Sequence, residues 1–257
     1  MTKFTVLLSC MYEKNMEIIK RSNINFPAVI VNQCDKKCTT NSGDILWIDS
    51  IERGLSRSRN MAIKNTDADI CLIADNDEIF DDDCREKILE SYRNIPDADI
   101  IIFNLHNKTT KLKNKIYKLQ RLEMLRVCSW QITFKRSAIV DNNISFDIKL
   151  GAGTGNGAGE ENKFLLDCYD KGLKIYHYPI NIATMVDNTS TWFNGFTEEF
   201  FYKHGMVTRY SLGLFISLLY AFYYIVFKYK LYRNDISLYR AAMQLFKGIF
   251  NNDLKSI

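Results

Sequence analysis

Two aspartates, Asp75 and Asp77, lie two positions apart immediately after the apolar run from Ile70 to Ala74. A short continuous apolar run that ends in polar residues predicts a strand buried on both faces, as in a parallel sheet. Such strands commonly present ligand groups at their carboxyl ends, and Mg²⁺ is often held by one or two carboxylates together with substrate phosphates. The alternative is a polar turn, because Asp and Asn side chains bond to neighbouring backbone groups. Residues 70–80 alone leave both interpretations open.

A second pair of carboxylates, Glu160 and Glu161, follows the glycine-rich run from Gly151 to Gly159 and precedes a predicted helix. Acidic residues in a first helical turn are stabilised by the helix dipole, which is the simplest interpretation of this pair. The glycine-rich run lacks the Lys-Ser/Thr ending of a phosphate-binding P-loop. We expect it to be a loop that allows backbone to approach a ligand closely.

A repeated alternation of strands and helices must position these carboxylates, and it is typical of a parallel sheet covered on both faces. The predicted strands are Phe4–Ser9, Ala28–Val31, Ile45–Ile48, Ile70–Ala74, Ile100–Leu105, Trp130–Phe134, Ile144–Leu150 and Leu173–Tyr178. The predicted helices are Asn15–Ser22, Gly54–Lys64, Asp83–Asn94 and Lys163–Lys171. Between them, the basic segment Lys108–Lys118 predicts a solvated excursion or hairpin.

The composition of the chain restricts the class of protein and its partners. A chain of 257 residues with 47% hydrophobic and 25% charged residues is an ordinary globular protein, with room for one large domain and an appendage. The net charge of +4 is too small to imply a nucleic-acid partner, and we predict none. Seven cysteines without a paired zinc spacing fit a reducing compartment. We therefore expect a cytoplasmic protein.

The C-terminal end contains apolar segments of a different kind. Residues Tyr210 to Phe227 form an 18-residue run without a charge, which meets the lower limit for a membrane span. Its tyrosines and the basic residues on both sides also suit a helix lying in the membrane interface. Ser237 to Phe250 predicts a second amphipathic helix. The alternatives to membrane contact through residues 210–250 are a helical hairpin packed on the rest of the chain and a homodimer interface.

Several motifs in order resemble a family-2 glycosyltransferase of the GT-A fold, of the type that builds bacterial polysaccharides. After an N-terminal strand come a Gly-x-x-x-x-Arg-Asn helix, an Asp-x-Asp motif and a later acidic pair that opens a helix. The matching residues are Gly54, Arg59-Asn60, Asp75-Asn76-Asp77, Glu160-Glu161 and the segment from Lys171-Gly172 to Pro179. The resemblance covers roughly residues 4–185. It implies a mixed, mostly parallel α/β sheet flanked by helices over residues 1–200, with residues 201–257 as a C-terminal helical appendage.

The resemblance also implies roles for individual residues. Asp75 and Asp77 would hold Mg²⁺ or Mn²⁺ against the diphosphate of a nucleotide-sugar donor, so that the metal neutralises charge on the leaving group. Glu161 stands where the family usually has Asp. It would be the general base that deprotonates an acceptor hydroxyl in an inverting transfer, with Glu160 as the alternative. The nucleotide sugar would contact Ser9, Tyr12, Asp35, Asp49, Arg59, Asn60, Asp75 and Asn76.

Three functions remain open at this point. The first is metal-dependent, inverting transfer of a sugar to a lipid-linked saccharide acceptor in surface polysaccharide synthesis, at the inner face of the cell membrane. The second is a nucleotidyltransferase, which would need a Gly-rich loop containing Lys or Arg after the first strand. Residues 9–15 offer no such loop. The third is a non-catalytic, membrane-associated protein that binds nucleotide sugars. Retention of both acidic motifs argues against it.

Overall fold

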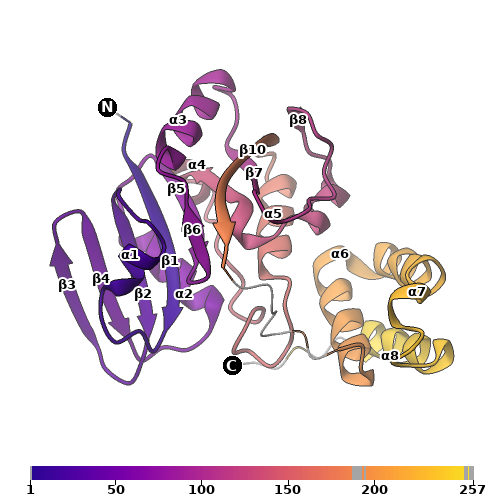
Figure 1. Cartoon of the computed structure of the whole chain (residues 1–257). Helices are drawn as coiled ribbons and strands as arrows, with labels where there is room; N and C mark the ends of the chain where they lie inside the picture. Colours follow the sequence, from indigo (N-terminus) through magenta and orange to yellow (C-terminus); the bar gives the residue numbers. More distant parts are fainter. Residues whose placement is uncertain (1, 187–192, 194, 252–253, 255–257) are drawn as a thin grey trace. The chain divides into compact units, whose positions relative to one another are not determined.

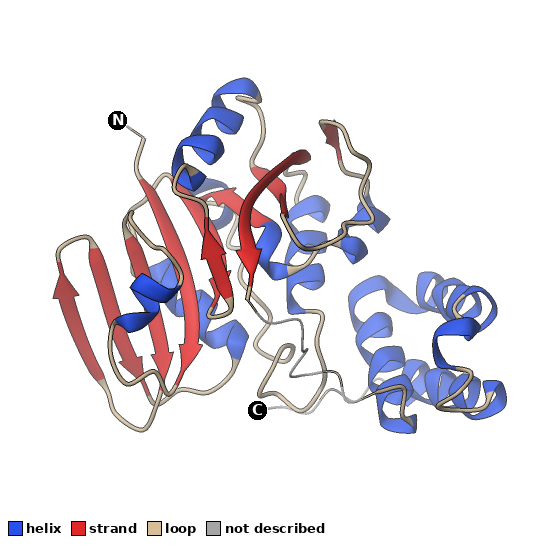
Figure 2. Ribbon diagram, in the orientation of Figure 1, coloured by secondary structure: helices blue, strands red, loops and turns tan. Residues whose placement is uncertain are grey.

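The computed structural model describes residues 2–186, 193, 195–251 and 254. The chain divides into two compact units, one of residues 1–146 and 161–188 and one of residues 147–160 and 189–257. The first contains a sheet flanked by helices, and the second contains the glycine-rich loop and the C-terminal helices (Figure 2). The boundary at residue 200 stays a prediction, and the second unit includes residues on both sides of it.

A mixed, mostly parallel sheet forms the first unit (Figure 1), which confirms the predicted fold class. Among the described residues its strands follow the order β3-β4-β2-β1-β5-β9-β7-β10-β6, with β8 paired to β10. They are β1 (Phe4–Met11), β2 (Ala28–Gln33), β3 (Cys38–Ser42), β4 (Ile45–Ser50), β5 (Ile70–Asp75), β6 (Glu78–Phe80), β7 (Ile100–Leu105), β8 (Tyr117–Lys118), β9 (Ile132–Lys135) and β10 (Ile175–Met185). Strand β1 pairs in parallel with β2 and β5, whereas β9 lies antiparallel between β5 and β7.

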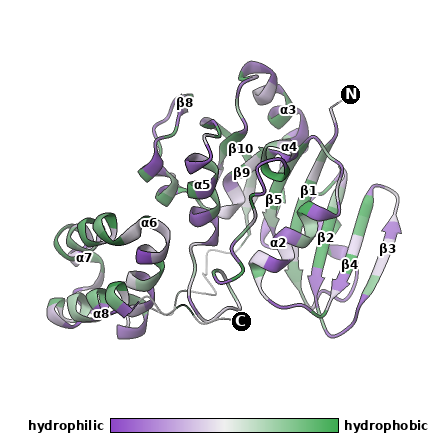
Figure 3. Ribbon diagram, turned by 180° about the vertical axis from the view of Figure 1, so that it is seen from behind, coloured by the Kyte–Doolittle hydropathy of each residue, from purple (hydrophilic) through white to green (hydrophobic). Residues whose placement is uncertain are grey.

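Helices cover both faces of this sheet. The α-helices of the first unit are α1 (Glu17–Arg21), α2 (Leu55–Lys64), α3 (Cys84–Asn94), α4 (Arg136–Val140) and α5 (Glu160–Asp170), with 3₁₀ helices η1 (Arg121–Arg126) and η2 (Ser129–Gln131). Ile18 of α1 and Ile88 of α3 belong to one core with Leu8 of β1. Helix α2 lies on the opposite face, as the front and back views show (Figures 1 and 3). Both faces of β1 are therefore buried.

Strand β5 has the burial that its sequence predicts. Ile70 is 4% exposed and the next four residues are fully buried. The strand ends at Asp75, and a two-residue turn through Asn76 and Asp77 leads into β6. Both aspartates therefore lie at the carboxyl end of a central, buried strand.

Two strand predictions need correction. Residues Ile144 to Leu150 do not form a strand but a loop with turns. Phe146 stacks on Phe164 of α5, with ring centroids 4.2 Å apart, so aromatic packing rather than sheet pairing buries this segment. The strand predicted to end at Tyr178 continues to Met185 as β10. Its register shifts between His177 and Asn181, which accommodates Pro179 because proline has no N–H to donate.

The second unit is built around helix α6 (Glu198–Phe227), followed by α7 (Tyr229–Tyr232) and α8 (Leu238–Asn251). Helices α6 and α8 cross at glycines. A methyl group at Gly205 would sit 2.1 Å from the carbonyl oxygen of Leu245, and one at Gly248 would sit 2.0 Å from that of Tyr202. Only glycine permits the two backbones to approach this closely.

Helix α6 is not one straight rod. Gly213 has φ 78° and ψ 172°, a conformation outside the helical region, and the chain turns sharply there (Figure 1). As a result the ring of Tyr224 lies 6.0 Å from that of Phe201, centroid to centroid. In a straight helix a separation of 23 residues would place them about 34 Å apart. The second half of α6, residues 214–227, therefore folds back toward the first half, residues 198–212.

Candidate active site

Asp75 is held by protein donors from two directions. The guanidinium of Arg59 in α2 donates from Nη2 to both carboxylate oxygens, at 3.0 and 3.2 Å. The hydroxyl of Ser129 donates to Oδ2 at 2.9 Å. The Arg59 side chain is fully buried, whereas that of Asp75 is 26% exposed. Asp75 thus pairs with a buried cation, and its own orientation is fixed while part of it still faces solvent.

Ser9 lies beside Asp75 in the sheet. The register of β1 and β5 pairs these two residues directly. The hydroxyl of Ser58 in α2 donates to the hydroxyl of Ser9 at 2.8 Å. Helix α2 therefore supplies Arg59 and Ser58 to the same strand ends, which explains why the Arg-Asn helix precedes the acidic motif in the chain.

The turn after Asp75 is fixed from beneath by Glu78. This side chain is only 1% exposed, and its Oε1 accepts the backbone N–H of Asp75 at 3.1 Å. Burial, and then the negative charge of Asp75, hold the pKa of Glu78 well above its usual value. On the other side of the turn, the N–H of Val186 donates to the carbonyl of Asp77 at 2.7 Å. Asn76 is exposed between the two aspartates.

One loop connects Asp75 to the second acidic motif. The amide of Asn162 in α5 donates to the carbonyls of Met124 and Val127, both at 2.9 Å. Ser129, which binds Asp75, follows two residues later. The segment 124–129 thus contacts both the acidic turn and the start of α5. Sequence reasoning missed Ser129 and Asn162, because a single serine or asparagine outside a motif carries no signal of its own.

Electrostatics place Glu161 beside this loop. Burial of its sulfur raises the pKa of the Cys128 thiol to about 11, and the negative charge of Glu161 adds to the shift. Lys111 and Lys108 oppose it, so the basic segment also reaches this neighbourhood. Glu161 is partly exposed. Glu160 is 5% exposed, and its carboxylate accepts the N–H of Gly159 at 3.1 Å. Glu161 is therefore the more accessible of the two carboxylates.

Tyr12 and Asp35 meet at the carboxyl ends of β1 and β2. The Tyr12 hydroxyl donates to Asp35 at 3.1 Å. Arg53, which sequence reasoning missed, forms an ion pair with Asp35 and lies over the Tyr12 ring at 5.4 Å from its centroid. Tyr12 adopts a positive φ of 53° and is 55% exposed. An exposed aromatic ring with a charged neighbour at this edge can stack on a planar ligand.

Asp49 and Asn60 have their polar atoms engaged within the protein. Burial alone would raise the pKa of Asp49, but hydrogen bonds, the strongest from Trp47 and Asn32, hold it below its usual value. The Asn60 amide donates to the carbonyl of Phe146 and accepts its N–H, both at 2.8 Å. These contacts stabilise the fold, and any contact of Asp49 or Asn60 with a nucleotide stays a prediction.

Asp75 and Asp77 suit a hard divalent cation. Both offer carboxylate oxygens at a fixed turn, and the Asp75 side chain is 26% exposed although it is paired with Arg59. In the described part of the chain, no group of three or more His, Cys, Asp or Glu side chains could hold a metal ion. A cation bound here would therefore need substrate oxygens or water to complete its coordination, which is how Mg²⁺ usually binds. The residues fit a metal shared with a phosphate ligand.

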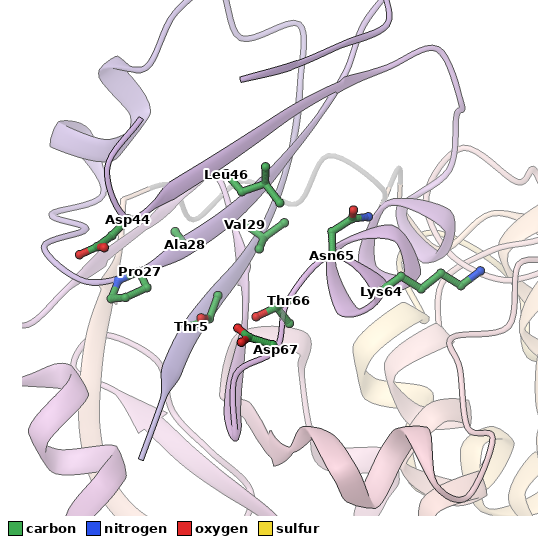
Figure 4. Close-up of a pocket in the computed structure, with 10 residues that line it drawn as sticks. All are labelled: Thr5, Pro27, Ala28, Val29, Asp44, Leu46, Lys64, Asn65, Thr66 and Asp67. Atoms are coloured by element: carbon green, nitrogen blue, oxygen red, sulfur yellow. The ribbon is translucent and has the colours of Figure 1, made fainter. Parts of the chain in front are cut away.

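A pocket of about 440 Å³ lies elsewhere, among the starts of the strands and the end of α2 (Figure 4). Its lining includes Thr5 of β1, Ala28 of β2 and Asp67, which precedes β5. Asp75 lies at the opposite, carboxyl end of β5. In open α/β sheets ligands bind at carboxyl ends, so this pocket is separate from the candidate active site.

Comparison with known proteins identifies the family to which this sheet and its acidic turn belong. Residues 22–151, about half of the chain, match the family model Glycosyl transferase family 2. The chain belongs to this family. Comparison with curated proteins gives no match by sequence.

Among solved structures the chain is similar to S. aureus TarS. Residues 1–349 of TarS in complex with UDP-GlcNAc align with 80% of this chain at 15% identity and a TM-score of 0.59. The chain spans 66% of that fragment and 43% of a longer TarS chain. The mannosyltransferase PcManGT from Pyrobaculum calidifontis, in complex with GDP-Man and Mn²⁺, aligns with 97% of this chain and 86% of its own length at 10% identity and a TM-score of 0.53. At these identities the likeness shows the fold.

Proposed function

We propose that this glycosyltransferase moves a hexose-type sugar from a nucleoside-diphosphate donor to a hydroxyl of a saccharide acceptor, with inversion, in surface polysaccharide synthesis. The observation that carries the proposal is the connected pair of acidic motifs. Asp75 is fixed by Arg59 and Ser129, and the loop containing Ser129 is bound by Asn162, next to Glu161. One carboxylate site for the leaving diphosphate and one for the attacking hydroxyl are what such a displacement needs.

On the donor side, Asp75 and Asp77 hold Mg²⁺ or Mn²⁺. When bound, the cation neutralises charge that develops on the leaving diphosphate. Arg59 and Ser129 keep the Asp75 carboxylate in place, so little reorganisation is needed when the donor binds. The similarity to proteins crystallised with UDP-GlcNAc and with GDP-Man and Mn²⁺ supports a nucleotide-sugar donor and a divalent metal.

The nucleoside lies over the carboxyl ends of β1, β2 and β5. Ser9, Asp75 and Asn76 face the donor from β1 and the β5–β6 turn, and Tyr12 and Asp35 face it from the ends of β1 and β2. Support comes from the exposed ring of Tyr12 and its contacts with Asp35 and Arg53.

On the acceptor side, Glu161 takes the proton from the attacking hydroxyl, with Glu160 as the alternative base. The partial exposure of Glu161 supports this order. The lysine-rich segment 108–118 supports a lipid-linked acceptor through its positive charge. A saccharide linked to lipid carries phosphate, which lysines attract. We place the enzyme in the cytoplasm, at the inner face of the cell membrane, with contact through residues 210–250.

Substitution of the candidate base tests the proposal. Glu161→Gln should leave donor binding unchanged and lower transfer by at least about 100-fold, because general bases contribute roughly 10²–10⁴-fold. Glu160→Gln is the matched control and should keep most of the transfer activity. If Glu161→Gln transfers sugar at the wild-type rate while Glu160→Gln does not, the base is Glu160. If neither variant loses transfer, the acidic pair has no catalytic role.

A further inference from the structure

The second half of α6 carries an apolar face that the described residues of the second unit leave exposed. Phe215, Leu219, Phe222 and Val226 recur at spacings of four, three and four residues, which places them on one side of a helix. Phe215 is 75% exposed and Phe222 is 62% exposed. The same segment is predominantly green, the colour of apolar residues, in Figure 3. Contiguous exposed apolar patches of this kind mark interaction sites.

The opposite face of the same helix segment already completes the core of the second unit. Ala221 is 1% exposed, and Tyr224 packs against His204 with ring centroids 4.9 Å apart. Tyr224 also stacks on Tyr232 of α7 at 6.1 Å. The core of the second unit therefore does not use the exposed face.

The segment is too short to cross a bilayer. By length and composition alone, α6 is the one helix in the described chain that passes the test for a membrane span. The turn at Gly213 leaves 14 residues, 214–227, in the second half. At 1.5 Å per residue they extend about 21 Å, against a hydrocarbon core of about 30 Å. A helix of this length with one apolar face lies in the plane of the membrane surface.

The basic residues beside the apolar face distinguish between a second copy of the chain and a lipid surface as its partner. No Asp or Glu occurs from residue 200 to residue 234, whereas Lys228, Lys230 and Arg233 follow the apolar segment directly. Lys228 lies 5.4 Å from the ring centroid of Tyr223. No ion pair is formed by Lys230 or Arg233 with any described residue. A two-fold dimer through this segment would offer the rim no carboxylate, because the segment contains none, whereas an anionic lipid surface neutralises it.

We propose that the second half of α6 docks in the plane of an anionic bilayer. Phe215, Leu219, Phe222 and Val226 enter the acyl boundary, and Lys228, Lys230 and Arg233 bind lipid headgroups. This deepens the membrane contact proposed above by naming the helix face, its orientation and the lipid class. It does not depend on transferase activity, because vesicle binding is measured without donor or acceptor.

Co-sedimentation of the full-length chain with vesicles tests the proposal. Vesicles of phosphatidylcholine with 30% phosphatidylglycerol should bind the wild type, and pure phosphatidylcholine should bind it several-fold more weakly. The double variant Phe215→Ser/Phe222→Ser should reduce binding at least tenfold. The matched control Ile51→Ser/Leu122→Ser removes side chains of similar exposure, 60% and 55%, from the first unit and should bind like the wild type. Circular dichroism establishes that each variant is folded.

Depth measurements separate lying from spanning. Phe215→Trp and Val226→Trp should be quenched equally by brominated lipids, because both ends of an in-plane helix sit at one depth. Unequal quenching would contradict the in-plane orientation. Two other results overturn the proposal: wild-type binding unchanged by the double serine variant, or no vesicle binding together with a dimer that this variant dissociates. Either result, with donor hydrolysis retained, leaves the transferase proposal standing.

Discussion

The two compact units differ in which side chains they leave exposed to solvent. In the sheet unit the central strand β5 is buried from Ile70 to Ala74, and the polar residues at its end bind one another. In the helical unit α6 buries one face and leaves large apolar side chains such as Phe215 exposed on the other. The sheet unit therefore presents polar groups to solvent at the end of its central strand, whereas the helical unit presents apolar side chains. The polar groups of the sheet unit suit chemistry on a charged substrate. The apolar face of the helical unit suits attachment of the enzyme to a membrane surface.

The largest expected effect is in the sheet unit. Asp77→Ala should lower sugar transfer at least 100-fold, since loss of one group that stabilises developing charge commonly costs about 10²–10³-fold. Vesicle binding should not change. The control Asp67→Ala removes an exposed aspartate at the other edge of the sheet and should be as active as the wild type. Full activity of Asp77→Ala, or of the wild type in excess chelator, would show that the acidic turn holds no catalytic metal.

The next largest effect should be a loss of stability in the helical unit. Gly205→Ala places a methyl group 2.1 Å from a backbone oxygen of α8, which cannot move without moving its helix. Overpacking usually costs about 1–3 kcal/mol of the free energy of unfolding, so thermal denaturation should show an earlier transition. Donor binding should survive. The control is Met243→Ala, which changes a residue of α8 that is 44% exposed, and it should shift the melting transition little. A wild-type melting curve for Gly205→Ala would mean that the helices do not cross at this glycine.

A smaller effect should follow from Ser129→Ala. Its hydroxyl donates at 2.9 Å to a carboxylate oxygen of Asp75, and a hydrogen bond to a charged group contributes roughly 1.5–3 kcal/mol. We expect transfer to fall about tenfold, with a higher metal concentration needed for half-maximal rate and an unchanged acceptor KM. Ser137→Ala, at an exposed serine in α4, serves as the control. If the metal requirement of Ser129→Ala equals that of the wild type, Ser129 does not position Asp75.

The mildest effect should be a change in pH dependence. His204 Nε2 is buried without a hydrogen-bond partner among the described residues, and burial lowers the pKa of His204 to about 4. Its unfolded value is about 6.5. The native state favours the neutral ring, so its contribution to stability is present above pH 6.5 and is lost as the pH falls toward 4. His204→Phe should remove this part of the acid destabilisation, as followed by denaturation midpoints. Identical pH profiles would contradict the burial of the ring.

Much of the sheet unit could be predicted from sequence because its signals are local. The apolar run that ends at Asp75 identifies β5, and the Arg-Asn helix before it supplies Arg59. The contacts that complete the site are not local. Ser129 is 54 residues from Asp75, and Asn162 lies 35 residues from Val127. Hydrogen bonds between single polar residues so far apart leave no periodicity or spacing to detect.

The misjudged segments failed for physical reasons of the same kind. The residues around Phe146 alternate between apolar and polar like a strand. In the structure the Phe146 ring stacks on Phe164 and its backbone N–H donates to the Asn60 side chain, so the segment is held without pairing in the sheet. Gly213 stands in an uninterrupted apolar run, where a single glycine is usually tolerated within a helix. The aromatic contacts between the two halves of α6 are what make it a turn.

The most direct test of the central claim is a thermal-shift screen of nucleotide sugars with and without Mn²⁺, run on the wild type and on Asp77→Ala. A ligand that binds the native state raises the melting temperature, and the shift grows with the logarithm of the ratio of ligand concentration to Kd. The account predicts that at least one UDP- or GDP-linked sugar stabilises the wild type in the presence of Mn²⁺ and that Asp77→Ala loses this shift. Equal stabilisation of both proteins, or none by any nucleotide sugar, would contradict it.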